Sequence, residues 1–393
     1  MVLSCVVLTV FSVLVTVVWV SRHVMIHQQQ RSGQMLGPDC PGPGDEPPPL
    51  SVIVAAKDEE ACIERCVRSM LDQDYPNFEV IVCNDRSDDN TAAIVQRIAD
   101  EDTRLRLVNI ESLPEGWCGK NNAMQTGIAQ SSGEWICMID ADCRQTSNRT
   151  LSVALKYALD NDIDLFSILP DLEMNGFWEK VIQPVCSGVM MIWFSPNKVN
   201  NPDKPNAYAN GAFMLMRREV YQAIGTHEAV KDQVNEDMHM ADRIKKSGKK
   251  LRVLRSDGLY TVRMYTSFKQ IIRGWSRIFF GTFGTLKRLT ISFLLMAVMG
   301  LLPYAAALVG FLGFHSGGSI AALVCGIAGL AGVAMQMSVI FRYYRLLGNA
   351  GALAVTYSMA CIITLVVIII SMTKLRPGAT VTWKSTSYSR TKT

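Results

Sequence analysis

Charge is scarce in this sequence and unevenly spread. Asp, Glu, Lys and Arg make up 19% of the 393 residues, whereas 49% are hydrophobic. The net charge of +4 is too small and too diffuse to indicate nucleic-acid binding. Each of four uncharged segments reaches the roughly 20 residues that cross a bilayer core of about 30 Å. We therefore expect one N-terminal and about three C-terminal transmembrane helices, at residues 1–21, 289–314, 319–341 and 350–373.

The first apolar segment lacks the features of a cleaved secretory signal. No basic region precedes it, and no small-x-small cleavage site follows it. Arg22 and Arg31 come after it instead, so the positive-inside rule places the following domain in the cytoplasm. The basic tail, residues 374–393, also favours the cytoplasm, although three full C-terminal crossings would place it outside. Either one C-terminal segment is re-entrant or interfacial, or the charge rule does not hold here. The bases of the tail are Lys374, Arg376, Lys384, Arg390 and Lys392.

The eleven cysteines show no spacing typical of a metal site or of a disulfide framework. Cys62 and Cys66 share one face of a predicted helix, and no histidine follows to complete a metal site. We interpret them as a buried structural pair. Reduced thiols are typical of a cytoplasmic domain.

Strand-like and helix-like segments alternate after the Pro/Gly-rich stretch at residues 37–49, so a domain begins near Leu50. This order predicts an α/β domain with a mostly parallel sheet and helices on both faces. The strands are expected at residues 50–56, 78–84, 104–110 and 133–140, and the helices at 59–73, 89–100 and 120–130.

The second half of the soluble part is less regular. Residues 177–194 are apolar and aromatic but are interrupted by Pro184, which indicates a helix lying against the membrane. Residues 212–218 predict a strand, and residues 234–247 predict a helix that opens with acids and closes with bases. Residues 267–283 mix aromatic and basic side chains, as interfacial helices do.

These segments predict six parts along the chain. They are an anchor (1–21), a Pro/Gly linker (22–49), the α/β domain (50–266), an interfacial amphipathic helix (267–284), a C-terminal membrane region (285–373) and a basic tail (374–393).

Acidic residues follow three of the predicted strands, where ligands bind in parallel sheets. Glu59 and Asp85 follow the first two strands, and Asp140 and Asp142 follow the fourth. Two carboxylates at a strand end can hold Mg²⁺ or Mn²⁺, which would offset the charge of a departing nucleoside diphosphate. The alternative is a turn in which one Asp caps the next helix. The two interpretations of the Asp140-Ala141-Asp142 triplet are equally good in isolation.

Two further positions can carry chemistry. An acid of Glu236-Asp237, at the start of a helix, can act as a general base, or it can merely complement the helix dipole. Lys120, at the start of another helix, can hold a phosphate, or it can be an ordinary solvated lysine. His239 has no second His or Cys placed to form a metal site with it.

Six motifs in order give the chain a resemblance to a known family. The segments VAAKDEE, VCNDRSDDNT, GWCGKNNAMQTG, MIDAD, NEDMHMA and QIIRGW resemble the family 2 glycosyltransferases, which have a GT-A fold of Rossmann-like type. The layout is similar to membrane-anchored members, namely ceramide glucosyltransferases and the hopanoid- or carotenoid-associated enzymes of bacteria. The likeness runs from about Leu50 to Trp275 and extends to the C-terminal anchors.

The resemblance implies a role for each matching residue. Glu59 would lie near the nucleotide base and Asp85 would hold a uracil, although Asn84 and Arg86 depart from the family pattern. Asp237 would be the catalytic base of an inverting displacement. Asp142 would bind the metal, and Asp140 would contact the nucleotide and assist with the metal. The other implied contacts with the nucleotide-sugar, its diphosphate or the acceptor are Lys120, Glu236, Gln270, Arg273 and Trp275. The last three match the family motif only if Gly274 is taken as an insertion.

From the resemblance we expect an integral protein of a bacterial plasma membrane, with its catalytic domain in the cytoplasm. It would transfer one sugar from a UDP-sugar to a lipid hydroxyl of a sphingolipid, hopanoid, isoprenoid or glycerolipid. One alternative is a processive polysaccharide synthase, for which three C-terminal segments are few. The other is a non-catalytic membrane scaffold, which would be expected to lack the acids that are present here.

Overall fold

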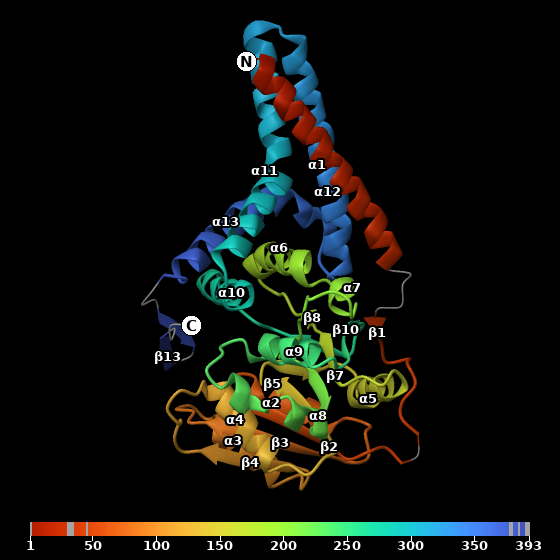
Figure 1. Ribbon diagram of the computed structural model, residues 1–393, viewed down its shortest axis with the longest axis vertical. Coiled ribbons are helices and arrows are strands. Elements are labelled where there is room, and N and C mark those ends of the chain that lie inside the picture. The colour runs from red at the N-terminus through yellow and green to blue at the C-terminus, as the bar shows by residue number, and fades with distance from the viewer. Residues whose placement is uncertain (1, 30–34, 45, 377–379, 384–385, 390–393) are drawn as a thin grey trace.

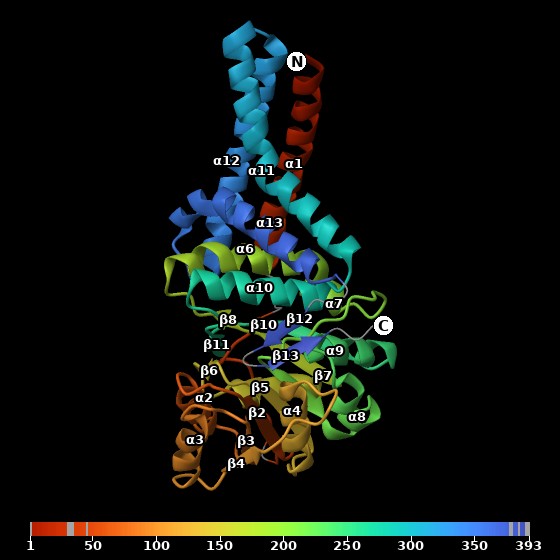
Figure 2. The ribbon, with the colours of Figure 1, turned by 90° about the vertical axis from the view of Figure 1, so that its left-hand side faces the viewer.

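The computed structural model describes residues 2–29, 35–44, 46–376, 380–383 and 386–389. A sheet domain lies at one end of the molecule and a stalk of long helices at the other (Figure 1). Two helices, α6 (Phe177–Phe194) and α10 (Phe268–Phe283), lie across the junction between them (Figure 2). The N-terminus is at the far end of the stalk, whereas the last described residues lie beside the sheet domain.

The central sheet has eight strands in the order β1-β10-β7-β9-β5-β2-β3-β4. Neighbours are parallel except at β9, which is antiparallel to both β5 and β7. The predicted mostly parallel sheet is therefore confirmed. Its strands are β1 (Met35–Leu36), β2 (Leu50–Ala56), β3 (Phe78–Asp85), β4 (Leu105–Ile110), β5 (Trp135–Asp140), β7 (Leu165–Leu169), β9 (Met214–Arg217) and β10 (Leu251–Ser256).

The alternation of side chains along β2 distributes the covering helices over two faces. Val52 and Val54 pack in one core with α2 (Ile63–Leu71), α3 (Thr91–Ala99) and α5 (Thr150–Asp160). Ile53 packs on the opposite face against α4 (Gly119–Ala129). A Cβ at Gly127 of α4 would lie 2.6 Å from Cys83 Sγ and 2.7 Å from Ile53 Cγ2, so only glycine allows this close approach.

A second, small sheet positions the acids that follow β5. It has the order β6-β11-β8, formed by β6 (Cys143–Gln145), β11 (Tyr260–Val262) and β8 (Asp171–Leu172). Cys143 pairs with Val262, so the turn between β5 and β6 is held at both ends by sheet hydrogen bonds. Strands of two or three residues have no readable alternation, and for that reason β1, β6, β8 and β11 were not predicted.

Four helical segments of the described chain are long and apolar enough to cross a membrane, as predicted. They are residues Val2–Val24 of α1 (Val2–Gln29), α11 (Leu286–Gly317), α12 (Ile320–Leu346), and Gly351–Thr373, which comprises the 3-10 turn η2 (Gly351–Thr356) and α13 (Tyr357–Thr373). The first helix continues past the predicted end at Ser21, because no proline or glycine follows until Gly33.

A break in the hydrogen bonding of α11 ties three stalk helices together. Pro303 has no N–H, so the Met299 carbonyl loses its partner within the helix. That carbonyl instead accepts hydrogen bonds from Trp19 Nε1 of α1 at 3.2 Å and from Gln336 Nε2 of α12 at 2.8 Å. Pro303 weakens α11 locally, but the carbonyl that it leaves without a helical partner connects α11 to α1 and α12.

The last apolar segment does not continue the upright stalk. α1, α11 and α12 form the stalk, whereas α13 lies strongly inclined above α6 and α10 (Figures 1 and 2). At its end, Lys374 Nζ donates a hydrogen bond to Ser276 Oγ of α10 at 2.8 Å. The chain thus returns to the side of the sheet domain, in agreement with the alternative of an interfacial C-terminal segment. Of the tail bases, Lys384, Arg390 and Lys392 lie outside the described residues.

The two helices at the junction form where the aromatic patterns predicted them, and they run parallel to each other. Trp178 and Phe268 pack at their N-terminal ends with ring centroids 4.9 Å apart, and Phe194 and Phe283 pack at their C-terminal ends at 6.5 Å. Pro184 is accommodated within α6, and its carbonyl accepts a hydrogen bond from Tyr343 Oη of α12 at 3.0 Å. One hydrophobic core therefore extends from the sheet into the membrane helices.

Candidate active site

One large cavity joins the carboxyl edge of the sheet to the membrane helices. Its volume is about 2320 Å³. At the sheet end it is lined by Asp140, Asp142 and Asp237, and at the other end by Trp19 of α1 and Met296 of α11. The acids predicted from separate motifs therefore face the same space. That space also contacts apolar side chains of the stalk.

Asp140 and Asp142 lie at the end of β5 and in the turn to β6. Asp142 Oδ1 is buried and has no hydrogen-bond partner among the described residues. Burial and the nearby charges of Asp140 and Glu59 raise the pKa of Asp142 to about 7. A buried, unpartnered carboxylate oxygen next to other acids favours a bound cation.

Lys120 connects the two acidic motifs. Its Nζ lies 2.6 Å from Asp140 Oδ1 and 2.7 Å from Glu236 Oε1. Burial lowers the Lys120 pKa, but the charges of Asp140, Glu236 and Asp237 outweigh burial and raise that pKa well above its ordinary value. Lys120 is therefore not a solvated surface lysine. Its predicted contact with a phosphate stays a prediction, since both near partners of its amine are carboxylates.

Asp237 lies in the first turn of α9 (Glu236–Lys246). Its Oδ2 accepts a hydrogen bond from the Gly211 N–H at 3.0 Å, and its Oδ1 accepts one from the Met238 N–H at 2.7 Å. Burial and the charge of Glu236 raise the pKa of Asp237 to about 7. A carboxylate with a pKa near the working pH can both hold and release a proton, as a general base requires.

Gly211 is a site residue that the sequence did not reveal. A Cβ there would lie 2.9 Å from Lys120 Nζ and 3.4 Å from Asp237 Oδ2, so no side chain fits between these groups. The signal that could have pointed to it is the glycine that opens the GAFMLM segment just before β9. Its N–H orients Asp237, and its missing side chain leaves room for the Lys120 amine.

Glu59 and Asp85 are placed differently from one another. Glu59 lines the cavity, and its Oε2 accepts a hydrogen bond from Cys62 Sγ at 3.2 Å. Asp85 is buried at the end of β3, and its Oδ1 accepts a hydrogen bond from Arg86 Nε at 2.8 Å. It is not among the residues that line the cavity. The predicted contact between Asp85 and the base would therefore require Arg86 to release it.

The three predicted residues of α10 all line the cavity, but they differ in exposure and in their hydrogen-bond partners. Gln270 Oε1 accepts hydrogen bonds from Thr266 N at 3.0 Å and Thr266 Oγ1 at 3.1 Å, which stabilises the start of the helix. Arg273 is exposed to the cavity. Trp275 is buried, and its Nε1 has no hydrogen-bond partner among the described residues. An indole N–H without a partner is a free donor for a ligand.

Gly274 is an ordinary residue of a continuous helix and forms no bulge in α10. A Cβ at this position would overlap the ring of Tyr265. Glycine here therefore allows the Tyr265 ring to pack against α10. Burial, together with the charges of Asp142 and Asp140, raises the pKa of the Tyr265 hydroxyl despite a hydrogen bond from Arg277. Tyr265 and Arg277 both line the cavity, and neither was predicted as a site residue.

Asp140 and Asp142 fit a divalent metal that draws most of its ligands from elsewhere. Within the described parts of the chain, no group of three or more His, Cys, Asp or Glu is arranged to hold a metal ion. Two carboxylates are nevertheless the usual protein contribution where Mg²⁺ or Mn²⁺ also binds substrate phosphates and water. The unpartnered Asp142 Oδ1 is the observation that supports this fit.

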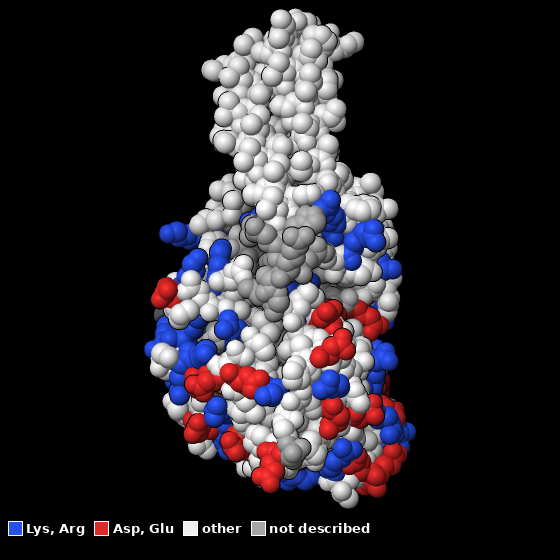
Figure 3. Space-filling model, turned by 90° about the vertical axis from the view of Figure 1, so that its right-hand side faces the viewer, with Lys and Arg blue, Asp and Glu red and all other residues white. Residues whose placement is uncertain are grey.

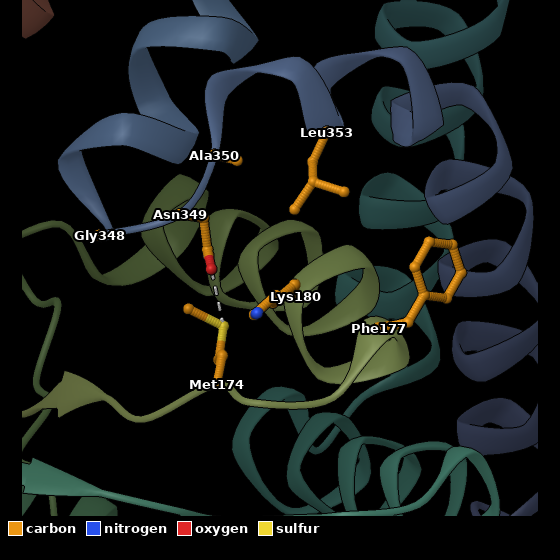
Figure 4. A pocket seen from close by; sticks show the side chains of 7 residues that line it. All are labelled: Met174, Phe177, Lys180, Gly348, Asn349, Ala350 and Leu353. Carbon is orange, nitrogen blue, oxygen red and sulfur yellow. Dashed lines mark hydrogen bonds between the residues drawn. The ribbon is translucent and has the colours of Figure 1, made fainter.

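A smaller pocket of about 480 Å³ lies apart from these acids, between the first turn of α6 and the loop that follows α12 (Figure 4). Its lining includes Phe177, Lys180 and Leu353, and Lys180 is its one ionisable residue. None of the residues that line it is a carboxylate, histidine or cysteine that could bind a metal ion.

Comparison with known proteins gives a family match for part of the domain. Residues 51–225 match the sequence model of the family described as "Glycosyl transferase family 2". Beta-monoglucosyldiacylglycerol synthase of Trichormus variabilis is 27% identical over 194 residues, which cover 48% of this chain and 40% of that protein. The 4,4'-diaponeurosporenoate glycosyltransferase of Staphylococcus aureus is 23% identical over 231 residues, covering 58% and 60%.

A shorter match is closer in sequence. The GalNAc(5)-diNAcBac-PP-undecaprenol beta-1,3-glucosyltransferase of Campylobacter jejuni is 33% identical over 95 residues, covering 24% of this chain and 30% of that protein. The chain thus spans between 30% and 60% of the length of these three curated relatives.

Among solved structures, the mannosyltransferase PcManGT from Pyrobaculum calidifontis, in complex with GDP-Man and Mn2+, is similar over 94% of this chain and 98% of that one. The TM-score is 0.54 at 18% sequence identity, so the likeness concerns the fold. Together with the family match, it confirms the expected GT-A type fold with membrane helices.

Proposed function

Because residues 51–225 match the sequence model of glycosyl transferase family 2, we propose that this chain transfers one hexose from a UDP-sugar to a hydroxyl of a membrane lipid. The cavity that joins the acidic groups to the stalk is the observation that carries this proposal. A soluble acceptor would need no contact with α1, α11 and α12, whereas a lipid can keep its apolar part there while its hydroxyl reaches Asp237.

The names of the relatives support a lipid acceptor. They refer to a diacylglycerol, to diaponeurosporenoate and to an undecaprenol diphosphate, which are all hydrophobic molecules. The cavity end near the stalk is lined by apolar side chains such as Met296, Met299 and Ile340. Flexible methionines adapt to irregular apolar ligands. The lipid class is therefore the broad one of sphingolipids, isoprenoids and glycerolipids.

The donor would lie at the sheet end of the cavity. Asp142, assisted by Asp140, would hold Mg²⁺ or Mn²⁺, which when bound offsets the negative charge of the leaving nucleoside diphosphate. Arg273 would contact the same diphosphate, and the free Trp275 N–H would donate to the donor or the acceptor. Glu59 would lie near the base, and Asp85 would hold the uracil once Arg86 has moved aside.

Asp237 would remove the proton of the acceptor hydroxyl as that oxygen attacks the anomeric carbon. The Gly211 and Met238 N–H groups hold the two carboxylate oxygens, so the base needs little reorganisation. Lys120 spans Asp140 and Glu236 and thereby fixes the base relative to the donor-binding acids. A direct displacement inverts the configuration at the anomeric carbon, and a retained configuration would contradict this mechanism.

The distribution of bases favours a cytoplasmic domain in a bacterial plasma membrane. Lys and Arg side chains gather at the base of the uncharged stalk on the face shown in Figure 3. The bases nearest the spans, Arg22, Arg288, Arg342 and Lys374, all lie near helix ends that point toward the sheet domain. The far ends of the stalk, within residues 1–21 and 289–341, carry no Lys or Arg. The positive-inside rule then places the sheet domain in the cytoplasm.

The test is a transfer assay with the full chain in lipid nanodiscs. A panel of UDP-sugars would be supplied with Mn²⁺ and a bacterial lipid extract, and the lipids would be analysed by mass spectrometry. We expect a product that carries one hexose. A ladder of longer products would support the processive synthase, and donor binding without any product would support the scaffold.

A further inference from the structure

Three cationic side chains gather on the wall of the cavity that α10 forms. Arg273 and Arg277 are four residues apart and therefore lie on one face of this helix. Lys374, at the end of α13, reaches the same helix through its hydrogen bond to Ser276 Oγ at 2.8 Å. All three line the large cavity. A residue directly after the last apolar segment thus belongs to the wall of the candidate donor site.

No acid of the described parts of the chain forms an ion pair with these cations. Among the ion pairs of the described residues, none includes Arg273, Arg277 or Lys374. The described partner of Arg277 is the neutral hydroxyl of Tyr265. Burial and the charge of Arg277 lower the pKa of Lys374, which shows that the two cations are close and poorly solvated. Like charges held together in this way favour an anionic ligand.

Tyr265 links the cations to the acids of the same cavity. Its hydroxyl interacts with Arg277 and also experiences the charges of Asp142 and Asp140, and all four residues line the cavity. A ligand in this part of the cavity therefore meets both carboxylates and cations. A diphosphate fits such a space, because a divalent cation on the carboxylates and the bases of α10 can each neutralise part of its charge.

We propose that Arg277 and Lys374 form a phosphate-binding site beside Asp142, and that the diphosphate of the donor occupies it. This inference rests on the proposed function, because it takes the nucleoside diphosphate as the ligand. The inclined course of α13 then has a role in donor binding. That segment brings Lys374 to the donor, so the membrane region and the donor site are built from the same elements. An anionic lipid headgroup presents the same phosphate chemistry, and the experiment separates the two sources.

The experiment measures the affinity of the full chain for UDP by calorimetry with saturating Mn²⁺, in nanodiscs of neutral lipid and, in parallel, in nanodiscs that contain anionic lipid. We expect Lys374→Gln and Arg277→Gln each to weaken UDP binding about tenfold, as the loss of one charge-assisted contact does. Arg277→Lys should recover part of the affinity, since it keeps the charge. Lys287→Gln is the matched control, because Lys287 is exposed near the end of α10 and does not line the cavity. It should bind UDP like the wild type.

Each result has a defined meaning. If the wild-type chain does not bind UDP, the proposed function is contradicted. If the wild type binds UDP and the two glutamine variants bind it equally well, only the phosphate site is wrong. If the variants lose a dependence on anionic lipid in the nanodisc while UDP binding is unchanged, the phosphate belongs to a headgroup and the assignment to the donor is overturned. Thermal melting of each variant verifies that weakened binding does not reflect misfolding.

Discussion

Replacement of Asp237 by Asn removes one proton acceptor and changes little else. The amide has the size of the carboxylate, and its oxygen can keep one of the bonds from the Gly211 and Met238 N–H groups. The substitution also removes a charge that is buried next to Glu236, so we expect no loss of stability. General base catalysis contributes about 10²–10⁴ in rate. The barrier should therefore rise by about 3–5 kcal/mol at about 1.4 kcal/mol per tenfold change.

The pH dependence gives a second, independent measure. The carboxylate is the active form of Asp237, and burial together with Glu236 raises its pKa to about 7. The wild-type rate should therefore fall about tenfold per pH unit below pH 7 and level off above it. Asp142 has a similarly raised pKa, to about 7, so the assay is run at saturating Mn²⁺. A bound cation favours the charged form of Asp142 and moves its titration to lower pH.

The assay compares kcat across pH with the affinity for UDP, for wild type and for Asp237→Asn. We expect the variant to keep its UDP affinity within about twofold, a difference of less than about 0.5 kcal/mol, since other residues make the proposed contacts with the donor. It should lose transfer, and its remaining rate should not depend on pH between 5 and 8. Asp232→Asn serves as a control, because Asp232 is exposed and does not line the cavity. The role of Asp237 is refuted if the Asn variant retains more than about a tenth of the wild-type rate, or if its rate still falls as the pH drops below 7.

Three further changes test other parts of the site. Lys120→Met leaves the buried Glu236 and the partly exposed Asp140 without their common partner. It should cost about 2 kcal/mol of stability, measured by thermal melting in detergent, because solvent screens part of the Asp140 charge. Mn²⁺ at a hundred times its dissociation constant should raise the free energy of unfolding of the wild type by about 2.7 kcal/mol at pH 8. The same Mn²⁺ concentration should leave the stability of the Asp142→Asn variant unchanged. Because protonation of the Asp142 carboxylate opposes metal binding, the increase in wild-type stability caused by Mn²⁺ should become smaller as the pH falls below 7. Gly274→Ala should destabilise the protein by about 1–3 kcal/mol through overlap with the Tyr265 ring, whereas Gly188→Ala, whose added Cβ would lie 3.9 Å from its nearest neighbour, should not.

Local patterns in the chain were sufficient for the elements from β2 to β5, whereas α5, β7 and β10 were not predicted. The strands β2, β3, β4 and β5 and the helices between them form where the alternation of patterns predicted them. Hydropathy alone identified the apolar segments, because crossing a bilayer requires a length that any long uncharged run displays. The edge strand β1 and the short strands of the second sheet were not predicted, because segments of two or three residues form strands only when a partner strand pairs with them.

The chemistry of the site depended on contacts between distant segments. A motif could place Asp140 and Asp142 at a strand end, but it could not show that Lys120 bridges Asp140 to Glu236. Nor could it show that Asp85 is held by Arg86 away from the cavity. These contacts depend on the side-chain rotamers and on how α4, β5 and α9 pack, and such packing is decided by the whole core.

The amino-acid sequence by itself determined the class of fold, the apolar spans and the types of residue available for chemistry. These properties depend on neighbours within one helix or strand, and for that reason they can be read along the chain. The tertiary structure alone decided which charges meet, the inclined course of α13 and the arrival of Lys374 at α10. The physical reason is that charges and hydrogen bonds act over a few ångströms in space, whatever the distance along the chain.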